Sequence, residues 1–182
     1  MTASHRKWLQ TADQANLKFN GGHVAAIIVL GVRYSAGGAM DKNINEIDGA
    51  CHCGTVRFHV RLKNGLHSAR RCTCSYCRMR GAVAVSANIS DITILQGEDA
   101  LTLYQFNTNT AKHYFCSKCG IYTHHQRRSN PQEYGVNAVC LAGISPFDFE
   151  ELPVNDGTSH PSDRGKDASS ELAGILRFYP RQ

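Results

Sequence analysis

Seven of the eight cysteines of this chain fall into three tight clusters, and these are the residues whose types and spacing could do chemistry. The clusters are C-x-C at Cys51 and Cys53, C-x-C-x2-C at Cys72, Cys74 and Cys77, and C-x2-C at Cys116 and Cys119. Two cysteines separated by one residue form a poor disulfide, but their thiolates can bind one ion together. We therefore predict that the clusters bind metal in a reducing compartment, the cytoplasm.

The first and last clusters together supply the four ligands of a closed, structural zinc site. In an extended segment, side chains at positions i and i+2 point to the same side, so Cys51 and Cys53 can both face one ion. Cys116 and Cys119 have the spacing of a zinc-ribbon knuckle, whose turn brings two sulfurs together. A site that joins segments so far apart in the chain would contribute directly to folding.

The middle cluster has one ligand fewer than a closed zinc site requires. Three protein ligands and one open position are the coordination of catalytic zinc, where the open position accepts water or substrate. We predict that Cys72, Cys74 and Cys77 hold a second, catalytic zinc ion. Two alternatives stay open: a division of the cysteines that joins Cys51 and Cys53 to Cys72 and Cys74, and a fourth protein ligand for the middle cluster. The candidates for that fourth ligand are Cys140, His52, His113, His124 and His125.

Arginines surround the middle cluster. Arg70 and Arg71 precede it, Arg78 and Arg80 follow it, and Arg127 and Arg128 come after the last cluster. A guanidinium group binds a carboxylate through two parallel hydrogen bonds, so this arrangement favours an anionic partner. We predict that Arg78 and Arg80 contact the substrate. The alternative is a solvated basic rim that offsets the charge of the thiolates.

The length and composition indicate one globular domain with extensions. The chain has 182 residues, of which 42% are apolar and 19% charged. Most of its segments alternate between apolar and polar residues, as Thr55–Leu62 does, and glycine or asparagine breaks separate them. We expect a mainly β protein of small twisted antiparallel sheets with few short helices. The other expected strands are Ala82–Ala87, Ile92–Leu95, Leu101–Phe106, Lys112–Phe115, Ile121–His125 and Tyr134–Leu141, the last of which includes Cys140. Beyond Phe149 we expect a long irregular loop, with Leu172–Tyr179 as a final strand or short helix.

The N-terminal segment differs from the rest. Residues 1–45 are expected to be a poorly ordered extension, and residues 1–39 contribute most of the formal net charge of +5. Their apolar run, Val24–Val32, faintly resembles a secretory signal, but it follows an overlong leading region and ends at Arg33. It is also far shorter than the roughly 20 residues that span a bilayer. We expect no membrane partner, and the near-neutral remainder makes a nucleic-acid partner unexpected.

The cysteine motifs resemble those of the glutathione-dependent formaldehyde-activating enzyme family, which also includes centromere protein V. The matching strings are GACHCGTV at 49–56, CTCSYC at 72–77 with Arg80-Gly81, and FCSKCG at 115–120. The resemblance covers residues 46–163 and leaves 164–182 as a C-terminal tail. It implies a β-tent-like fold clamped by two zinc ions. One zinc would be structural, on Cys51, Cys53, Cys116 and Cys119, and the other catalytic, on Cys72, Cys74 and Cys77.

The same resemblance implies an activity. It is the addition of the glutathione thiol to formaldehyde or a related small aldehyde, formally a carbon–sulfur lyase reaction in reverse. A free thiol is only a few per cent thiolate at neutral pH, and zinc with an open position would deprotonate it. Two other functions compete with this one. They are a non-catalytic zinc module for protein or nucleic-acid binding, and a thiol-based redox or metal-buffering protein, against which the lack of a thioredoxin-like βαβ pattern counts.

Overall fold

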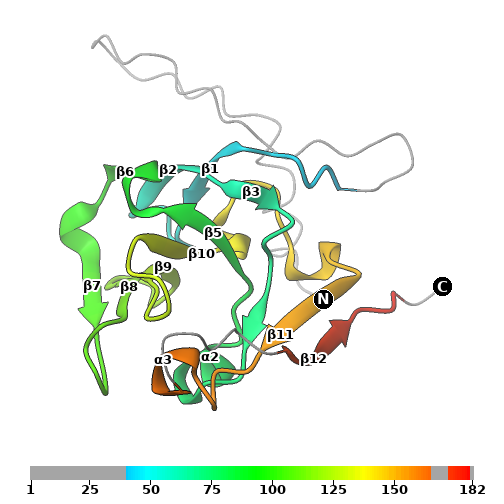
Figure 1. Ribbon diagram of the computed structural model, residues 1–182. Helices are drawn as coiled ribbons and strands as arrows, with labels where there is room; N and C mark the ends of the chain where they lie inside the picture. The colour runs from blue at the N-terminus through cyan, green and yellow to red at the C-terminus, as the bar shows by residue number, and fades with distance from the viewer. Residues whose placement is uncertain (1–39, 165–171, 181–182) are drawn as a thin grey trace, which may run out of the picture.

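Three small β-sheets form the molecule. The structure, a computed structural model, describes residues 40–164 and 172–180 (Figure 1). The first sheet has the order β1 (Glu46–Ala50), β2 (Arg57–Arg61), β6 (Ile92–Gln96). The second has the order β5 (Ala84–Asn88), β10 (Glu133–Asn137), β9 (Tyr122–Gln126), β8 (Lys112–Cys116), β7 (Leu101–Tyr104). The third has the order β12 (Leu172–Arg177), β11 (Glu151–Asn155), β4 (Arg71–Cys72).

Short elements connect these sheets. All strand pairs are antiparallel except β4 with β11, which is parallel. β3 (Lys63–Leu66) leads from the first sheet toward β4, and the described α-helices are α2 (Ser75–Arg80) and α3 (Pro161–Arg164). The 3₁₀ turns are η1 (Ile89–Asp91), η2 (Glu98–Ala100), η3 (Ala138–Cys140) and η4 (Pro146–Asp148). The expected mainly β fold with small antiparallel sheets and few short helices is confirmed. No helix in the described part of the chain is long and apolar enough to cross a membrane.

The main core lies between the first two sheets. Alternation places Phe58 and Val60 of β2 fully inside, while Arg57 and Arg61 on the same strand face solvent. Val85 of β5 and Val136 of β10 belong to the same buried cluster. The hydrophobic free energy of these residues, about 1.5–3 kcal/mol for each large side chain, therefore fixes which face of each strand is inside.

The C-terminal half differs from the sequence prediction in two places. The expected strand Tyr134–Leu141 ends at Asn137, and the chain then makes the turn η3, so Cys140 lies in a buried turn rather than in a strand. The irregular loop expected after Phe149 is much shorter than predicted, because β11 and α3 lie there and leave only residues 156–160 as a loop between them. Pro153 concealed β11, since proline is rare in strands, but here β4 pairs only with Val154 and Asn155.

The structure describes part of the predicted N-terminal extension and part of the predicted C-terminal tail. The predicted N-terminal extension lies outside the described residues as far as residue 39, whereas Met40 and Ile44 pack against the main core. In the C-terminal tail, Leu172–Tyr179 contains the strand β12, which pairs with β11. Figure 1 shows β11 running toward the end of the molecule where α2 and α3 lie. The strand thus leads into a loop beside the middle cysteine cluster, Cys72, Cys74 and Cys77.

Burial of one histidine predicts how stability depends on pH. His124 of β9 is 4% exposed and stacks on Tyr114, and burial lowers its pKa to about 4. The unfolded chain, with the ordinary pKa of about 6.5, therefore binds more protons than the folded chain between pH 6.5 and 4. The contribution of neutral, buried His124 to the free energy of unfolding is therefore fully present above pH 6.5. It falls by about 3 kcal/mol as the pH drops to 4. We expect His124→Gln to flatten this part of the curve of unfolding free energy against pH, measured by urea denaturation. An unchanged slope would contradict the assignment.

Candidate metal centres

The first group of sulfurs joins two sheets. Cys51 and Cys53 follow β1, Cys116 ends β8, and Cys119 lies in the turn before β9. All four Sγ atoms lie within 4.8 Å of one another, with 3.5 Å between Cys51 and Cys53 and 3.8 Å between Cys53 and Cys116. Four sulfurs bound at about 2.3 Å around a tetrahedral zinc ion stand about 3.8 Å apart. The group therefore has the donor set and the spacing of a four-coordinate metal site.

Two similar turns bring these sulfurs together. The amide of Gly54 donates to the carbonyl of Cys51 at 3.0 Å, and the amide of Gly120 donates to the carbonyl of Cys116 at 2.8 Å. Both glycines have φ above +70°, a conformation that other residues adopt only at a cost. The amide of Val56 also donates to Cys51 Sγ at 3.3 Å. Cys51 and Cys116 are buried with Val56 and Ala100 in a small second core, so this group is part of the packing.

The second group lies at the start of α2. Cys72 comes from β4, Cys74 caps α2, and Cys77 lies within that helix; their sulfurs also lie within 4.8 Å of one another. The amide of Cys74 donates to Cys72 Sγ and the amide of Cys77 donates to Cys74 Sγ, each at 3.4 Å. The pKa of Cys74 is lowered because the thiols of Cys72 and Cys77 hydrogen-bond to its thiolate. A first thiolate thus forms at the cap of the helix.

No fourth protein donor joins this second group among the described residues. Cys140 is instead buried, where its Sγ lies 3.4 Å from both Asn137 Nδ2 and the carbonyl of Tyr122. His113 contacts Arg80, His124 lies in the core and His125 contacts the Tyr122 hydroxyl, while His52 is exposed. Cys51 and Cys53 do not share a group with Cys72 and Cys74 either, so the alternative that joined these four cysteines at one metal ion is wrong.

A loop that the sequence analysis did not single out closes one side of the second group. After β11, the carbonyl of Asn155 accepts from the Thr73 amide at 3.1 Å, and the amide of Gly157 donates to Thr73 Oγ1 at 3.0 Å. A Cβ atom at position 157 would lie 2.3 Å from Cys72 Sγ. Only glycine therefore lets this loop pack against the sulfurs. No local pattern shows this, because Gly157 and Cys72 meet only through the pairing of β11 with β4.

Arg80 lies against the sulfurs of the second group. Its guanidinium group donates to Cys77 Sγ at 3.5 Å, lies 3.3 Å from His113 Nδ1, and stacks 3.4 Å above the ring of Tyr122. Burial, and then the Arg80 cation, lower the pKa of His113 to about 4 and that of His125 well below its usual value. Both imidazoles are therefore neutral at pH 7, and Arg80 is the cation beside the thiolates.

A cavity of about 440 Å³ opens onto the second group. Its wall includes the three cysteines, two neutral histidines and the loop with Gly157. Arginines dominate its charged lining, and the predicted contact residues Arg78 and Arg80 are among them. The six are Arg70, Arg71, Arg78, Arg80, Arg127 and Arg128. The structure thus brings the sulfurs and the arginines to one chamber, which suits a small anionic ligand.

Comparison with known proteins places the chain in a family. Residues 46–151 match the family model of the glutathione-dependent formaldehyde-activating enzyme. The chain belongs to this family. A Halomonas elongata protein named "Putative glutathione-dependent formaldehyde-activating enzyme" is 33% identical over 81 residues, which are 40% of this chain and 51% of that protein. The chain thus spans about half the length of that curated relative.

A solved structure also matches a large part of this family member. It is the crystal structure of a Rhodobacter sphaeroides protein, 58% identical, with a TM-score of 0.58. The match covers 59% of this chain and 99% of the other one. The family resemblance inferred from the cysteine motifs is therefore confirmed.

The contact of Gly157 with Cys72 gives a test of the second group. We expect Gly157→Ala to displace the Cys72 sulfur, so that the purified protein binds one metal ion fewer than the unaltered chain, measured by elemental analysis. Gly174→Ala is the matched control, because a Cβ atom there meets nothing within 4 Å. Equal metal content in the two variants would contradict this role of Gly157.

Proposed function

We propose that this chain is a zinc-dependent enzyme of the carbon–sulfur lyase type, which adds a thiol such as glutathione to formaldehyde or a related small aldehyde. Membership of the family supports glutathione-dependent formaldehyde activation at the level of the family. The finer proposal rests on one observation. Three sulfurs, without a fourth protein donor in the described chain, face a cavity rich in arginine.

Both sulfur groups fit zinc. Thiolates select zinc over harder divalent ions, and the two groups have the ligand numbers of a closed and an open tetrahedral site. We assign the structural zinc to Cys51, Cys53, Cys116 and Cys119, and the catalytic zinc to Cys72, Cys74 and Cys77. Zinc at the second group would supply a Lewis acid that lowers the pKa of a bound thiol. Arg80 would offset the negative charge of three thiolates, which otherwise opposes a second anion.

The reaction needs one proton transfer and no redox partner. The sulfur of the thiol forms a bond to the carbonyl carbon, and the thiol proton ends on the carbonyl oxygen. Tyr122 donates its hydroxyl proton to the carbonyl of Gly135 at 2.7 Å, so the hydroxyl oxygen accepts from His125 Nδ1. His125 is thereby held in the tautomer whose Nε2 accepts a hydrogen bond. Its ring lines the cavity and can orient the hydroxyl group of the product.

The free state of all eight described cysteines supports a reducing compartment, and we propose the cytoplasm. The same thiols would be lost to disulfides in an oxidising compartment. We propose a small thiol and a small aldehyde as the partners, and we propose that the protein binds them in the cytoplasm.

Serine variants separate the two sulfur groups. We expect Cys74→Ser to keep the fold and one zinc ion but to reduce the catalysed exchange between formaldehyde and its glutathione adduct to the uncatalysed rate, measured by NMR. We expect Cys119→Ser to lower the unfolding free energy by several kcal/mol, because the metal joins two sheets. Cys140→Ser is the control, and it should keep both zinc ions and the exchange rate, since its sulfur lies in neither group.

The same measurements can contradict the proposal. If Cys74→Ser and Cys119→Ser lose the fold alike, the division into a structural and a catalytic zinc is wrong. If the unaltered protein holds two zinc ions but accelerates no exchange and binds no small thiol, it is a non-catalytic zinc module.

A further inference from the structure

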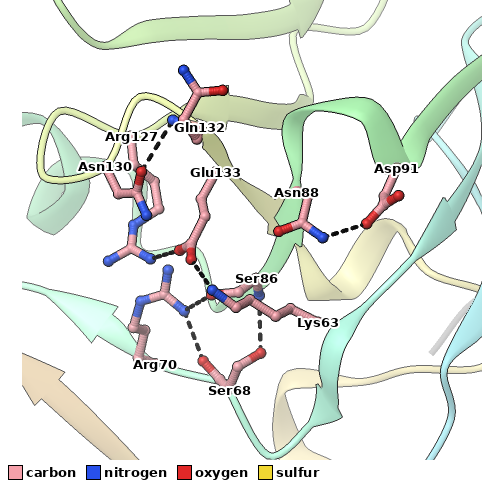
Figure 2. A network of polar contacts seen from close by, with 10 residues as sticks. All are labelled: Lys63, Ser68, Arg70, Ser86, Asn88, Asp91, Arg127, Asn130, Gln132 and Glu133. Carbon is pink, nitrogen blue, oxygen red and sulfur yellow. Dashed lines mark hydrogen bonds and ion pairs between the residues drawn. The ribbon is translucent and has the colours of Figure 1, made fainter.

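A second charged cluster lies on the cavity wall, away from the sulfurs. Figure 2 shows its centre, the carboxylate of Glu133 in β10, which forms ion pairs with Lys63 of β3 and Arg127 after β9. Arg70, just before β4, lies beside these groups. Three cationic side chains therefore gather around one carboxylate, whose side chain is only 9% exposed. The cluster has an excess of positive charge around a nearly buried carboxylate, with Lys63 reaching it from the solvent side.

Arg70 contributes most directly to that excess. Its Nη1 donates to the carbonyl of Ser68 at 2.8 Å and to Ser86 Oγ at 2.9 Å, and both acceptors are neutral. Within residues 40–164 and 172–180, no carboxylate lies at ion-pair distance from Arg70. These hydrogen bonds fix the orientation of the guanidinium group without compensating its charge. A fixed, uncompensated cation is a preorganised site for an anion.

The excess charge faces the cavity. Arg70 and Arg127 both line it, whereas Lys63 and Glu133 do not. Arg70 is also two positions before Cys72 in an extended segment, where Arg70 bridges to Ala84 and β4 begins at the next residue. Side chains two positions apart in such a segment point to the same side, roughly 6–7 Å apart along the strand. A short thiol can therefore reach the sulfur group and these arginines at once.

Two other arginines on the wall have partners that offset their charge. Arg80 donates to Cys77 Sγ, and Arg128 forms an ion pair with Asp163 of α3. Arg127 has Glu133, but Lys63 shares that carboxylate from outside the cavity. In the described chain Arg70 has no carboxylate at ion-pair distance and Arg127 has only one that it shares with Lys63, so both are open to an anionic ligand.

We propose that Arg70 and Arg127 form an anion subsite that binds a carboxylate of the thiol substrate, while its sulfur lies at the group of Cys72, Cys74 and Cys77. This inference rests on the proposed function and specifies which residues would bind a carboxylate of a thiol such as glutathione. Glu133 and the two serine contacts act as positioning groups, because they hold the guanidinium groups and do not themselves line the cavity.

Calorimetry on the zinc-loaded full chain can test the subsite with three probes. S-methylglutathione keeps the carboxylates but has no free thiol, 2-mercaptoethanol has a thiol and no carboxylate, and glutathione has both. The variants are Arg70→Gln, Arg127→Gln and Arg70→Lys, with Arg61→Gln as the charge-matched control. Arg61 is an exposed residue of β2 that pairs with Glu46 away from the cavity.

We expect Arg70→Gln and Arg127→Gln each to weaken S-methylglutathione binding at least about tenfold, since a hydrogen bond between charged partners is lost. Arg70→Lys should show an intermediate loss of affinity, because the ammonium group keeps the positive charge but lacks the paired N–H donors of the guanidinium group. 2-Mercaptoethanol should bind all variants within about twofold of the unaltered protein. Arg61→Gln should bind every probe as the unaltered protein does. Zinc content and thermal melting verify that each variant is folded, and Arg127→Gln suffices if Arg70→Gln does not fold.

The outcomes separate this inference from the proposed function. If Arg127→Gln and Arg70→Lys bind S-methylglutathione as tightly as Arg61→Gln does, the subsite is wrong, although thiol binding can stand. If the unaltered protein binds neither glutathione nor 2-mercaptoethanol at its metal, the proposed function fails. Arginine-dependent binding of S-methylglutathione would in that case still support an anion subsite.

Discussion

The crowding of sulfur atoms is the constraint on which this structure depends. Seven sulfur atoms lie in two groups within which every distance is at most 4.8 Å, and as thiolates they repel one another unless cations lie among them. Backbone amides of Val56, Cys74 and Cys77 donate to the sulfurs and offset part of this cost. Arg80 adds a full positive charge at the second group. The strands that flank each sulfur group keep its cysteines close together despite this repulsion.

Charge compensation then organises the whole cavity wall. Arg80 donates to Cys77 Sγ within α2, and the single carboxylate of Glu133 is shared by Arg127 and Lys63. Arg80 thus supports the site, whereas Arg70, with no carboxylate at ion-pair distance in the described chain, and Arg127, with a shared one, are the cations that our proposal assigns to a ligand. The distribution of carboxylates therefore determines which of the arginines can recognise an anion.

Local features of the site could be predicted from the sequence, and features that depend on tertiary contacts could not. The cysteine clusters are local, since i, i+2 and i, i+3 spacings are visible in the chain, and the structure groups them as the spacing indicates. The alternation in β2 predicted its buried face for the same reason. Gly157 and Glu133 were missed, because each meets the site through strand pairing far along the sequence. The orientation of Arg80 toward Cys77 depends on the ring of Tyr122, which comes from another strand.

The two sulfur groups differ most in their surroundings, and this difference supports separate roles for them. Cys51 and Cys116 are 3% and 0% exposed and pack in a small core, whereas Cys53 of the same group is exposed at the surface, and all four sulfurs are already drawn together. The second group borders a cavity, and its sulfurs come from a strand end and one short helix. The same ligand chemistry thus occurs once where the fold needs a cross-link and once where a small molecule can enter.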